Sequence, residues 1–189
     1  MKLVLNLHKY IEFISVLFYI CFMATRSKIL DTHEINQKLN RLAWQVYEKN
    51  LYEKDIVIVG ISTRGLILAK QLSAHINAIS KIKTKLAHLN LDKDNPYGKE
   101  VDLNLEVTEY ANKVVVLVDD VLNSGKTLMY AAKHFLGTPL KRLAIMVLID
   151  RNHNRYPVKA DYVGLSLATT LQEYISVILE GDGQGVYLS

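Results

Sequence analysis

Val114-Val-Val-Leu-Val-Asp-Asp-Val-Leu-Asn-Ser-Gly-Lys-Thr127 combines an apolar run, two adjacent acids, a short turn and the beginning of a helix. Its first five residues, 114–118, carry no polar side chain, which is typical of a parallel strand covered on both faces. A helix is predicted over 126–136, because Gly137 ends it and Pro139 follows. Ligands of parallel sheets bind beyond the carboxyl ends of the strands, so the acids and the turn stand where a binding site is expected.

The turn is suited to bind one phosphate group. Ser124-Gly125-Lys126-Thr127 stands at a helix start, where backbone N–H groups, two hydroxyls and the helix dipole attract an anion. Asp119 and Asp120, at the predicted strand tip, would repel a phosphate but can accept hydrogen bonds from vicinal sugar hydroxyls. The turn that would bind a phosphate and the two acids that would bind sugar hydroxyls together predict a site for ribose 5-phosphate.

Two other interpretations of this stretch stay open. A nucleoside-triphosphate loop also ends in Gly-Lys-Thr, but it needs a glycine five positions before the Gly-Lys pair, where this chain has Asp120. A solvated acidic strand end followed by a capped helix would carry no function. The ordered combination of strand, acids and turn favours the binding site over both.

The rest of the chain alternates helices and strands, which predicts an α/β fold with a mostly parallel twisted sheet flanked by helices. Asp31-Thr-His-Glu34 has the form of a capping box and marks the first helix. The polar segment 92–105, with Pro96 and Gly98, is interpreted as a hairpin or flap. The predicted helices are 32–50, 68–79 and 126–136, and the predicted strands are 56–59, 86–91, 114–118, 143–149, 162–165, 174–179 and 185–188.

Composition places the chain among ordinary globular domains. It has 189 residues, 50% hydrophobic and 22% charged, with a net charge of +4 that tolerates a polyanionic partner without requiring one. The single cysteine, Cys21, excludes a disulfide scaffold and a cysteine-rich zinc site. We interpret 23–189 as one domain and 1–22 as an extension upstream of a start at Met23; a signal-like segment or an anchor is the alternative.

Further motifs give the chain a family resemblance. Gly60-Ile-Ser-Thr-Arg-Gly65 follows the first predicted strand of the sheet, and Leu148-Ile-Asp-Arg-Asn-His153 precedes Pro157-Val-Lys-Ala-Asp-Tyr-Val-Gly164. With 114–127, these motifs resemble type I phosphoribosyltransferases, closest to the pyrimidine operon regulatory protein/uracil phosphoribosyltransferase (PyrR-like) family. The resemblance implies a small hood and a flexible flap, phosphoribosyl diphosphate and a nucleobase as substrates, Mg²⁺ as cofactor, a cytoplasmic location and a homodimer or higher homo-oligomer.

The resemblance also implies a role for each site residue. Asp119 and Asp120 would hold the ribose hydroxyls and, through these or through water, the metal ion. Asn123, Ser124, Gly125, Lys126 and Thr127 would bind the 5-phosphate. Ser62, Thr63 and Arg64 would bind the pyrophosphate, with Arg64 and the two aspartates as the catalytic set. Tyr162 would stack on the base, the Val163 backbone would read its edge, and Asp150 would complete the base site.

Departures from the family pattern leave alternatives for the function. Ser62 stands where an arginine is usual, Asn123 where a tyrosine is usual, and 165–171 lacks the usual basic residues. Uracil is the expected base, because Asn123 and Asp150 replace the acid and the lysine that purine-salvage relatives carry. A weakly catalytic, UMP-sensing and RNA-binding regulator of pyrimidine genes is one alternative. A hypoxanthine/guanine-type transferase is the other.

Overall fold

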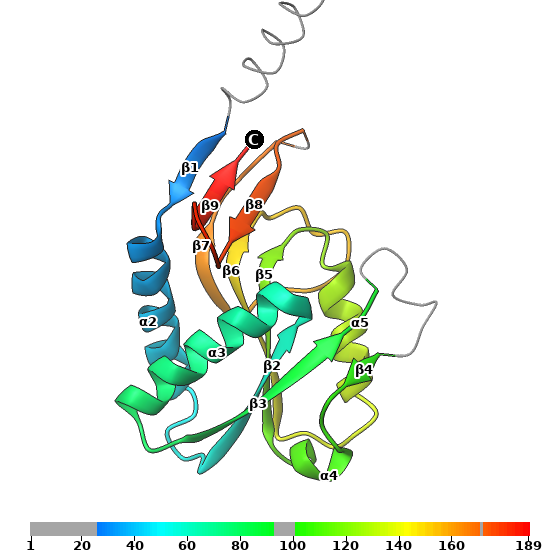
Figure 1. The fold of residues 1–189 in the computed structure, drawn as a ribbon. Coiled ribbons are helices and arrows are strands. Elements are labelled where there is room, and N and C mark those ends of the chain that lie inside the picture. Colours follow the sequence, from blue (N-terminus) through cyan, green and yellow to red (C-terminus); the bar gives the residue numbers. More distant parts are fainter. Residues whose placement is uncertain (1–25, 93–100, 171) are drawn as a thin grey trace, which may run out of the picture.

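A six-stranded sheet forms the centre of the computed structural model, which describes residues 26–92, 101–170 and 172–189 (Figure 1). Its strand order is β4-β3-β2-β5-β6-β7, and every neighbouring pair is parallel except β3 and β4. The predicted α/β class and mostly parallel sheet are confirmed. The strands are β2 (Asp55–Ile61), β3 (Lys83–Asn90), β4 (Asp102–Leu103), β5 (Val114–Leu122), β6 (Arg142–Asp150) and β7 (Tyr162–Ser166).

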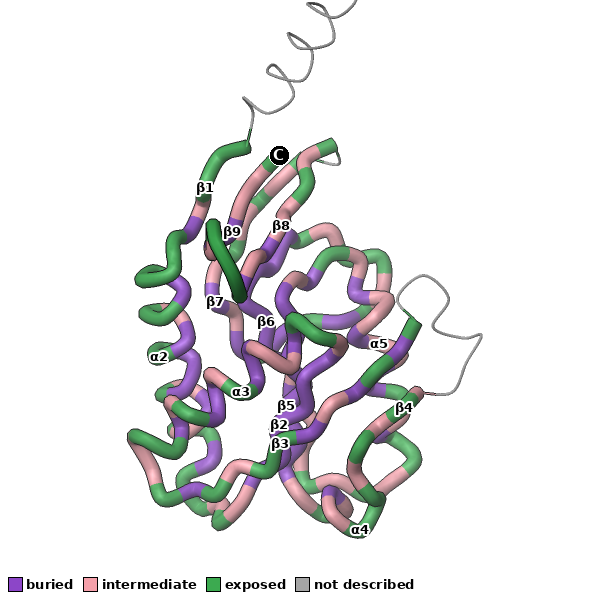
Figure 2. The backbone as a smooth tube through the Cα atoms, viewed as in Figure 1, coloured by how far each residue is buried: buried purple, intermediate pink, exposed green. Residues whose placement is uncertain are grey.

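Helices cover both faces of this sheet. The helices are α2 (Thr32–Glu48), α3 (Ser62–Ile79), the short α4 (Val107–Tyr110) and α5 (Lys126–Phe135). Along β5, Val114, Val116 and Val118 enter the core beneath α2 and α3, whereas Val115 and Leu117 enter the core beneath α5. Figure 2 shows the central strands as an almost continuous buried layer. Burial on both sides explains why 114–118 has no polar alternation.

A second, antiparallel sheet of three strands forms the hood. It has the order β1-β9-β8 and consists of β1 (Ser27–Leu30), β8 (Ile175–Ile178) and β9 (Gly185–Leu188). The hood lies beyond the carboxyl ends of β5 and β6 (Figure 1). The sequence predicted the two C-terminal strands but not β1.

The predicted helices and the hairpin are largely confirmed. Asp31 caps α2 with both bonds of a capping box, since its Oδ1 accepts from Glu34 N at 2.8 Å and its N–H donates to Glu34 Oε2 at 2.9 Å. α3 begins at Ser62, six residues before its predicted start. β4 pairs with the end of β3, which makes the base of a hairpin; residues 93–100 of the predicted flap lie outside the described residues.

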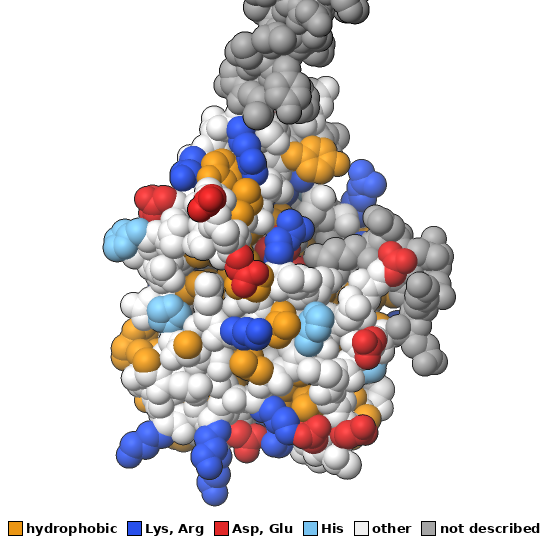
Figure 3. Space-filling model, in the orientation of Figure 1, with side chains coloured by type: hydrophobic (Ala, Val, Ile, Leu, Met, Phe, Trp, Pro, Cys, Tyr) orange, Lys and Arg blue, Asp and Glu red, His pale blue; other side chains and the backbone are white. Residues whose placement is uncertain are grey.

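The interpretation of 1–22 concerns residues outside the described ranges. Within 26–92, 101–170 and 172–189, no helix is both long and apolar enough to cross a membrane. On the face shown in Figure 3, acidic and basic side chains are interspersed over the surface.

Two glycines let the start of α3 approach the sheet closely. A β-carbon on Gly60 would lie 2.3 Å from Leu66 Cα, and one on Gly65 would lie 2.5 Å from the carbonyl oxygen of Val118. Both neighbours are backbone atoms, which cannot rotate away. The first turn of α3 is therefore held against the end of β5, where the predicted site begins.

We predict that Gly65→Ala lowers the free energy of unfolding by about 1–3 kcal/mol, because the added methyl group overpacks a site bounded by backbone. Gly137→Ala is the matched control: no atom lies within 4 Å of its added β-carbon, so its change should stay within about 0.5 kcal/mol. Urea unfolding of both variants measures the difference. Equal stability of the two variants would contradict the close packing of α3 on β5.

Candidate active site

The twin acids of the sequence lie inside the central strand rather than after it. β5 continues to Leu122, and the relative exposure of Asp119 and Asp120 is only 2% and 3%. Asp120 is directed toward α3, because its carboxylate pairs with Arg64 in the first turn of that helix. Oδ1 of Asp119 accepts a hydrogen bond from the backbone N–H of Asp120 at 2.9 Å. Two carboxylates are thus fixed at the carboxyl end of the sheet.

In the turn that follows β5, Gly125 supplies no side-chain cap to α5, and Oγ of Ser124 accepts a hydrogen bond from the N–H of Lys126 at 3.3 Å. Gly125 is the N-cap residue and has a left-handed backbone, with φ of 81°, which favours glycine. The carbonyl oxygen of Ser124 accepts hydrogen bonds from the N–H groups of Arg155 at 2.9 Å and Tyr156 at 3.0 Å. The 151–158 loop therefore supports the turn from behind, while the front of the turn, including Lys126, lines a cavity.

The first turn of α3 brings a cation to the acids. Nε of Arg64 lies 2.7 Å from Oδ2 of Asp120, in an ion pair whose carboxylate is buried and whose guanidinium is half exposed. Ser62 has φ of 54°, an unfavourable backbone conformation for a residue with a side chain. Thr63 is exposed. Of these three predicted pyrophosphate residues, Arg64 lines the cavity and Ser62 and Thr63 do not.

One cavity joins the two ends of the predicted ribose-phosphate site. Its volume is about 240 Å³, and it is lined by both aspartates and by all four residues of the turn 124–127. The predicted 5-phosphate residues and sugar residues are therefore brought together as expected. The wall consists of Arg64, residues 119–128, Arg151, Tyr174 and Ile175.

The prediction that Tyr162 stacks on a base is wrong. Tyr162 is only 1% exposed and is the first residue of β7. It pairs with Met146 of β6, which lies four residues before the carboxyl end of β6 at Asp150. Its hydroxyl accepts a hydrogen bond from Nη2 of Arg142 at 3.2 Å, and burial raises its pKa above the ordinary value. A parallel strand that starts at Tyr162 places this residue at the end of the sheet remote from the cavity.

Val163 and Asp150 are also engaged elsewhere. Arg41 of α2 donates from Nη2 to the carbonyl oxygens of Val163 at 2.9 Å and Gly164 at 2.8 Å, so this backbone edge holds α2 to β7 and does not line the cavity. Asp150 ends β6 at the correct edge of the sheet, but its Oδ1 accepts from the N–H of Asn152 at 2.9 Å. Contact between Asp150 and a base stays a prediction.

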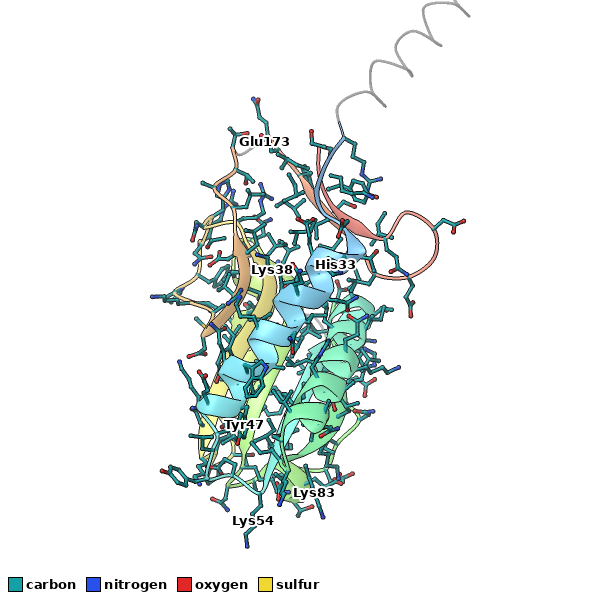
Figure 4. All side chains as sticks on the ribbon, turned by 90° about the vertical axis from the view of Figure 1, so that its left-hand side faces the viewer. His33, Lys38, Tyr47, Lys54, Lys83 and Glu173 are labelled. Atoms are coloured by element: carbon teal, nitrogen blue, oxygen red, sulfur yellow. The ribbon has the colours of Figure 1, made fainter. Side chains whose placement is uncertain are left out.

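The structure adds two residues that the sequence analysis missed. Arg151 is 5% exposed; its Nε donates to Oγ1 of Thr169 at 3.0 Å, and its Nη2 donates to the carbonyl oxygens of Thr170 at 3.2 Å and Glu173 at 2.6 Å. These bonds hold the chain that leads to Tyr174, a residue that is 70% exposed and lines the cavity. Figure 4 shows Glu173 at the hood end of the molecule, opposite Lys54 and Lys83.

A sequence signal existed for both residues. Arg151 directly follows an apolar strand, at the edge where ligands bind in parallel sheets. Tyr174 opens the predicted strand 174–179, but nothing in its local pattern shows that this strand folds back over the sheet. Its backbone is paired with the last residue of the chain, since Tyr174 N donates to the oxygen of Ser189 at 2.6 Å and Ser189 N donates back at 3.0 Å.

Comparison with solved structures shows the same fold in two phosphoribosyltransferases. The hypoxanthine phosphoribosyltransferase of Trypanosoma cruzi matches with a TM-score of 0.71 at 15% identity, and the matched region covers 87% of this chain and 96% of the T. cruzi chain. A hypoxanthine-guanine phosphoribosyltransferase from Bacillus anthracis has a TM-score of 0.67 at 23% identity, covering 79% and 84%. Identities this low show the fold alone.

Sequence comparison gives the family. The model of the phosphoribosyl transferase domain matches residues 25–177. "Bifunctional protein PyrR" of Thermoanaerobacter sp. (strain X514) is 35% identical over 169 residues, covering 84% of this chain and 93% of the relative. The protein of the same name from Clostridium acetobutylicum is 37% identical over 167 residues, with the same coverage. The chain therefore belongs to the type I phosphoribosyltransferases, in their PyrR-like branch.

Proposed function

We propose that this protein transfers ribose 5-phosphate from phosphoribosyl diphosphate to uracil, giving UMP and diphosphate, and that it has a role in pyrimidine regulation. The observation that carries the proposal is one cavity lined both by two buried aspartates and by a helix start whose N-cap residue is a glycine. This arrangement separates a region that attracts anions from a region that accepts hydroxyl hydrogens. A sugar monophosphate has both groups at the matching ends.

The 5-phosphate end is the turn before α5. Ser124, Lys126 and Thr127 line the cavity. We assign the phosphate to the backbone N–H groups of this turn, the two hydroxyls and the charge of Lys126. The left-handed backbone of Gly125, which favours glycine, shapes this turn, and a β-carbon there would meet Val158 at 3.4 Å and Tyr156 at 3.5 Å in the supporting loop. Support from the 151–158 loop keeps these donors in place before the substrate binds.

The ribose end is formed by Asp119 and Asp120. Both carboxylates can accept hydrogen bonds from the 2- and 3-hydroxyls, and their burial strengthens these bonds. Arg64 is paired with Asp120 in the absence of substrate. When a sugar hydroxyl takes over this carboxylate, the guanidinium becomes available to the diphosphate, together with the exposed Thr63.

The reaction breaks the bond from C1′ to the diphosphate oxygen and forms a bond from C1′ to the base nitrogen, while the proton of that nitrogen is released and can be taken up by the leaving diphosphate. Positive charge develops on the sugar ring, close to the two aspartates, and negative charge develops on the leaving diphosphate, close to Arg64. Fixed charges that stabilise developing charge, together with in-line positioning of the base, supply the catalysis. The protein thereby needs no covalent nucleophile.

The residues present fit Mg²⁺ as part of the substrate complex. Within the part of the chain that the structure describes, no group of three metal-binding side chains exists, so a cage made by protein alone is absent there. Mg²⁺ in phosphate sites is held by one or two carboxylates, substrate oxygens and waters, and Asp119 and Asp120 can contribute in this way. When bound, the ion neutralises charge on the diphosphate.

The base is assigned to the side of the cavity formed by Val121, Arg151 and Tyr174. Tyr174 offers an exposed ring for stacking, and Val121 offers an apolar surface. The uracil assignment rests on the PyrR-like branch and on Asn123 and Asp150. We also propose a cytoplasmic location and a homo-oligomer, on the family resemblance.

A second candidate is a UMP-sensing, RNA-binding regulator with weak catalysis. It is favoured by the loss of cations at Ser62 and along 165–171. The interspersed charges of Figure 3 speak against an extended basic surface on that face. Turnover separates the two candidates, because both bind UMP.

We predict that the full chain, given phosphoribosyl diphosphate and Mg²⁺, converts uracil to UMP and prefers uracil to hypoxanthine and guanine. Chromatographic detection of nucleotide product in a base screen measures this. UMP binding without turnover would support the sensor instead. Absence of product with every pyrimidine and purine base would defeat the enzymatic proposal.

We expect Asp120→Asn to lower kcat/KM about 10- to 100-fold, because a charged acceptor to a ribose hydroxyl is replaced by a neutral one. Asp182→Asn is the control: this exposed hood residue does not line the cavity, so its kinetics should match the unaltered protein. Steady-state kinetics with phosphoribosyl diphosphate as the varied substrate distinguish them. A value of kcat/KM for Asp120→Asn equal to that of the unaltered protein would show that Asp120 does not bind the substrate.

Two tyrosine variants test the corrected base site. Tyr174→Ala should raise KM for uracil about 10-fold, since stacking of an aromatic ring on a base is worth about 1–3 kcal/mol, and should leave KM for phosphoribosyl diphosphate nearly unchanged. Tyr162→Phe should leave both values unchanged, because its ring is buried away from the cavity. The reverse result, with Tyr162→Phe affecting uracil, would restore the original assignment.

A further inference from the structure

Little hydrophobic packing holds the segment that carries Tyr174. From 165 to 176, none of the described residues is buried, and Val177 is the next residue that enters the core. Tyr174 itself is 70% exposed. If such a segment were ordered only when a base binds, the ordering would cost part of the binding free energy. Polar contacts must therefore fix the segment if Tyr174 is to present a ready surface to a base.

Arg151 supplies these polar contacts. Its Nε donates to Oγ1 of Thr169 at 3.0 Å, and its Nη2 donates to the carbonyl oxygens of Thr170 at 3.2 Å and Glu173 at 2.6 Å. The planar guanidinium group presents its donors in a fixed arrangement, so one side chain serves three oxygens. The last of these oxygens belongs to the residue directly before Tyr174. The bonds thus fix the backbone next to the proposed stacking surface.

Arg151 is itself held by the central sheet. The residue is only 5% exposed, and its backbone N–H donates to the carbonyl oxygen of Leu122 at 3.0 Å. Leu122 ends β5, two residues after Asp120. A short series of hydrogen bonds therefore links the strand that carries the two aspartates to the backbone beside Tyr174. The position of this tyrosine relative to the ribose end of the cavity is set by these bonds.

The charge of Arg151 has a counterpart on the same segment. The Glu173 carboxylate accepts a hydrogen bond from the N–H of Thr170 at 2.6 Å, which lowers the pKa of Glu173, and the charge of Arg151 lowers this pKa further. Opposite charges on Arg151 and Glu173 reduce the cost of burying the guanidinium group. Nε2 of His153 donates to the carbonyl oxygen of Thr169 at 2.5 Å and adds a further contact to the segment.

We propose that Arg151 is a positioning residue, which holds Tyr174 in place as a preformed stacking surface for the base. This inference rests on the proposed function, because it takes Tyr174 as the residue that contacts uracil. Arg151 acts through the backbone of Glu173 and not through a contact of its own with the base. Replacing it should therefore weaken binding of the base and leave binding of the sugar phosphate unchanged. The replacement should have no effect where the ring of Tyr174 is already missing.

Calorimetric titration of the full chain with UMP and with ribose 5-phosphate tests this, because the ratio of the two affinities measures the contribution of the base. UMP should bind the unaltered protein about 10-fold tighter than ribose 5-phosphate, in keeping with stacking of one base on an aromatic ring. Arg151→Lys keeps the charge but loses the forked donors, and it should remove most of this 10-fold gain without changing the affinity for ribose 5-phosphate. Tyr174→Ala should remove the gain to the same extent, and the double variant Arg151→Lys/Tyr174→Ala should show no further loss.

Two more variants complete the test. Arg41→Lys is the matched control, because Arg41 also donates to two backbone carbonyl oxygens but does not line the cavity, and its gain should equal that of the unaltered protein. Thr169→Val removes only the acceptor of Arg151 Nε and keeps the shape of the side chain. It should lower the gain about 3-fold, and it keeps the test decisive if Arg151→Lys does not fold.

The opposite results overturn the inference. A gain that survives both Arg151→Lys and Thr169→Val, or one that is also lost in Arg41→Lys, would refute the positioning role and leave the proposed function standing. Weaker binding of ribose 5-phosphate by these variants would show general support of the fold instead. A further loss in the double variant would show direct contact between Arg151 and the base. Equal binding of UMP and ribose 5-phosphate by the unaltered protein would remove the base from Tyr174, and binding of neither would refute the proposed function as well.

Discussion

Asp119 and Asp120 are adjacent in sequence, almost excluded from solvent and placed at the end of the central strand. Ionised carboxylates are costly to bury without partners, so their surroundings must supply donors or cations. The structure supplies the N–H of Asp120 to Asp119 and the guanidinium of Arg64 to Asp120. A place that needs donors in this way is also a place that binds hydroxyl groups strongly.

The rest of the site follows from this constraint. Gly60 and Gly65 allow the first turn of α3 to reach the end of β5, which brings Arg64 to Asp120. The turn at Gly125 that follows β5 has the opposite electrostatic character to the aspartates, because the start of α5 lines the same cavity and a helix start attracts anions. An acidic end and a helix start line the same cavity, and these match the two ends of a sugar phosphate in the binding mode that we propose.

Sequence patterns predicted the parts of the molecule that depend on local periodicity and turn chemistry. The apolar run of β5, the capping box at Asp31 and the turn at Gly125 are examples. The start of α3 was placed too late, because its true start depends on a close approach between backbones. Tyr162 and Tyr174 show the limit most clearly: both are aromatic residues at strand starts, and only the long-range path of the chain decides which one reaches the cavity.

The central claim is that the two aspartates and the turn bind opposite ends of one sugar phosphate. Calorimetric titration of the protein with ribose 5-phosphate and with 2-deoxyribose 5-phosphate tests this without any base. Ribose 5-phosphate should bind about 10-fold tighter, and the difference should disappear in Asp120→Asn while the deoxy sugar binds as before. Equal affinity of the two sugars for the unaltered protein, or binding of neither, would contradict the claim.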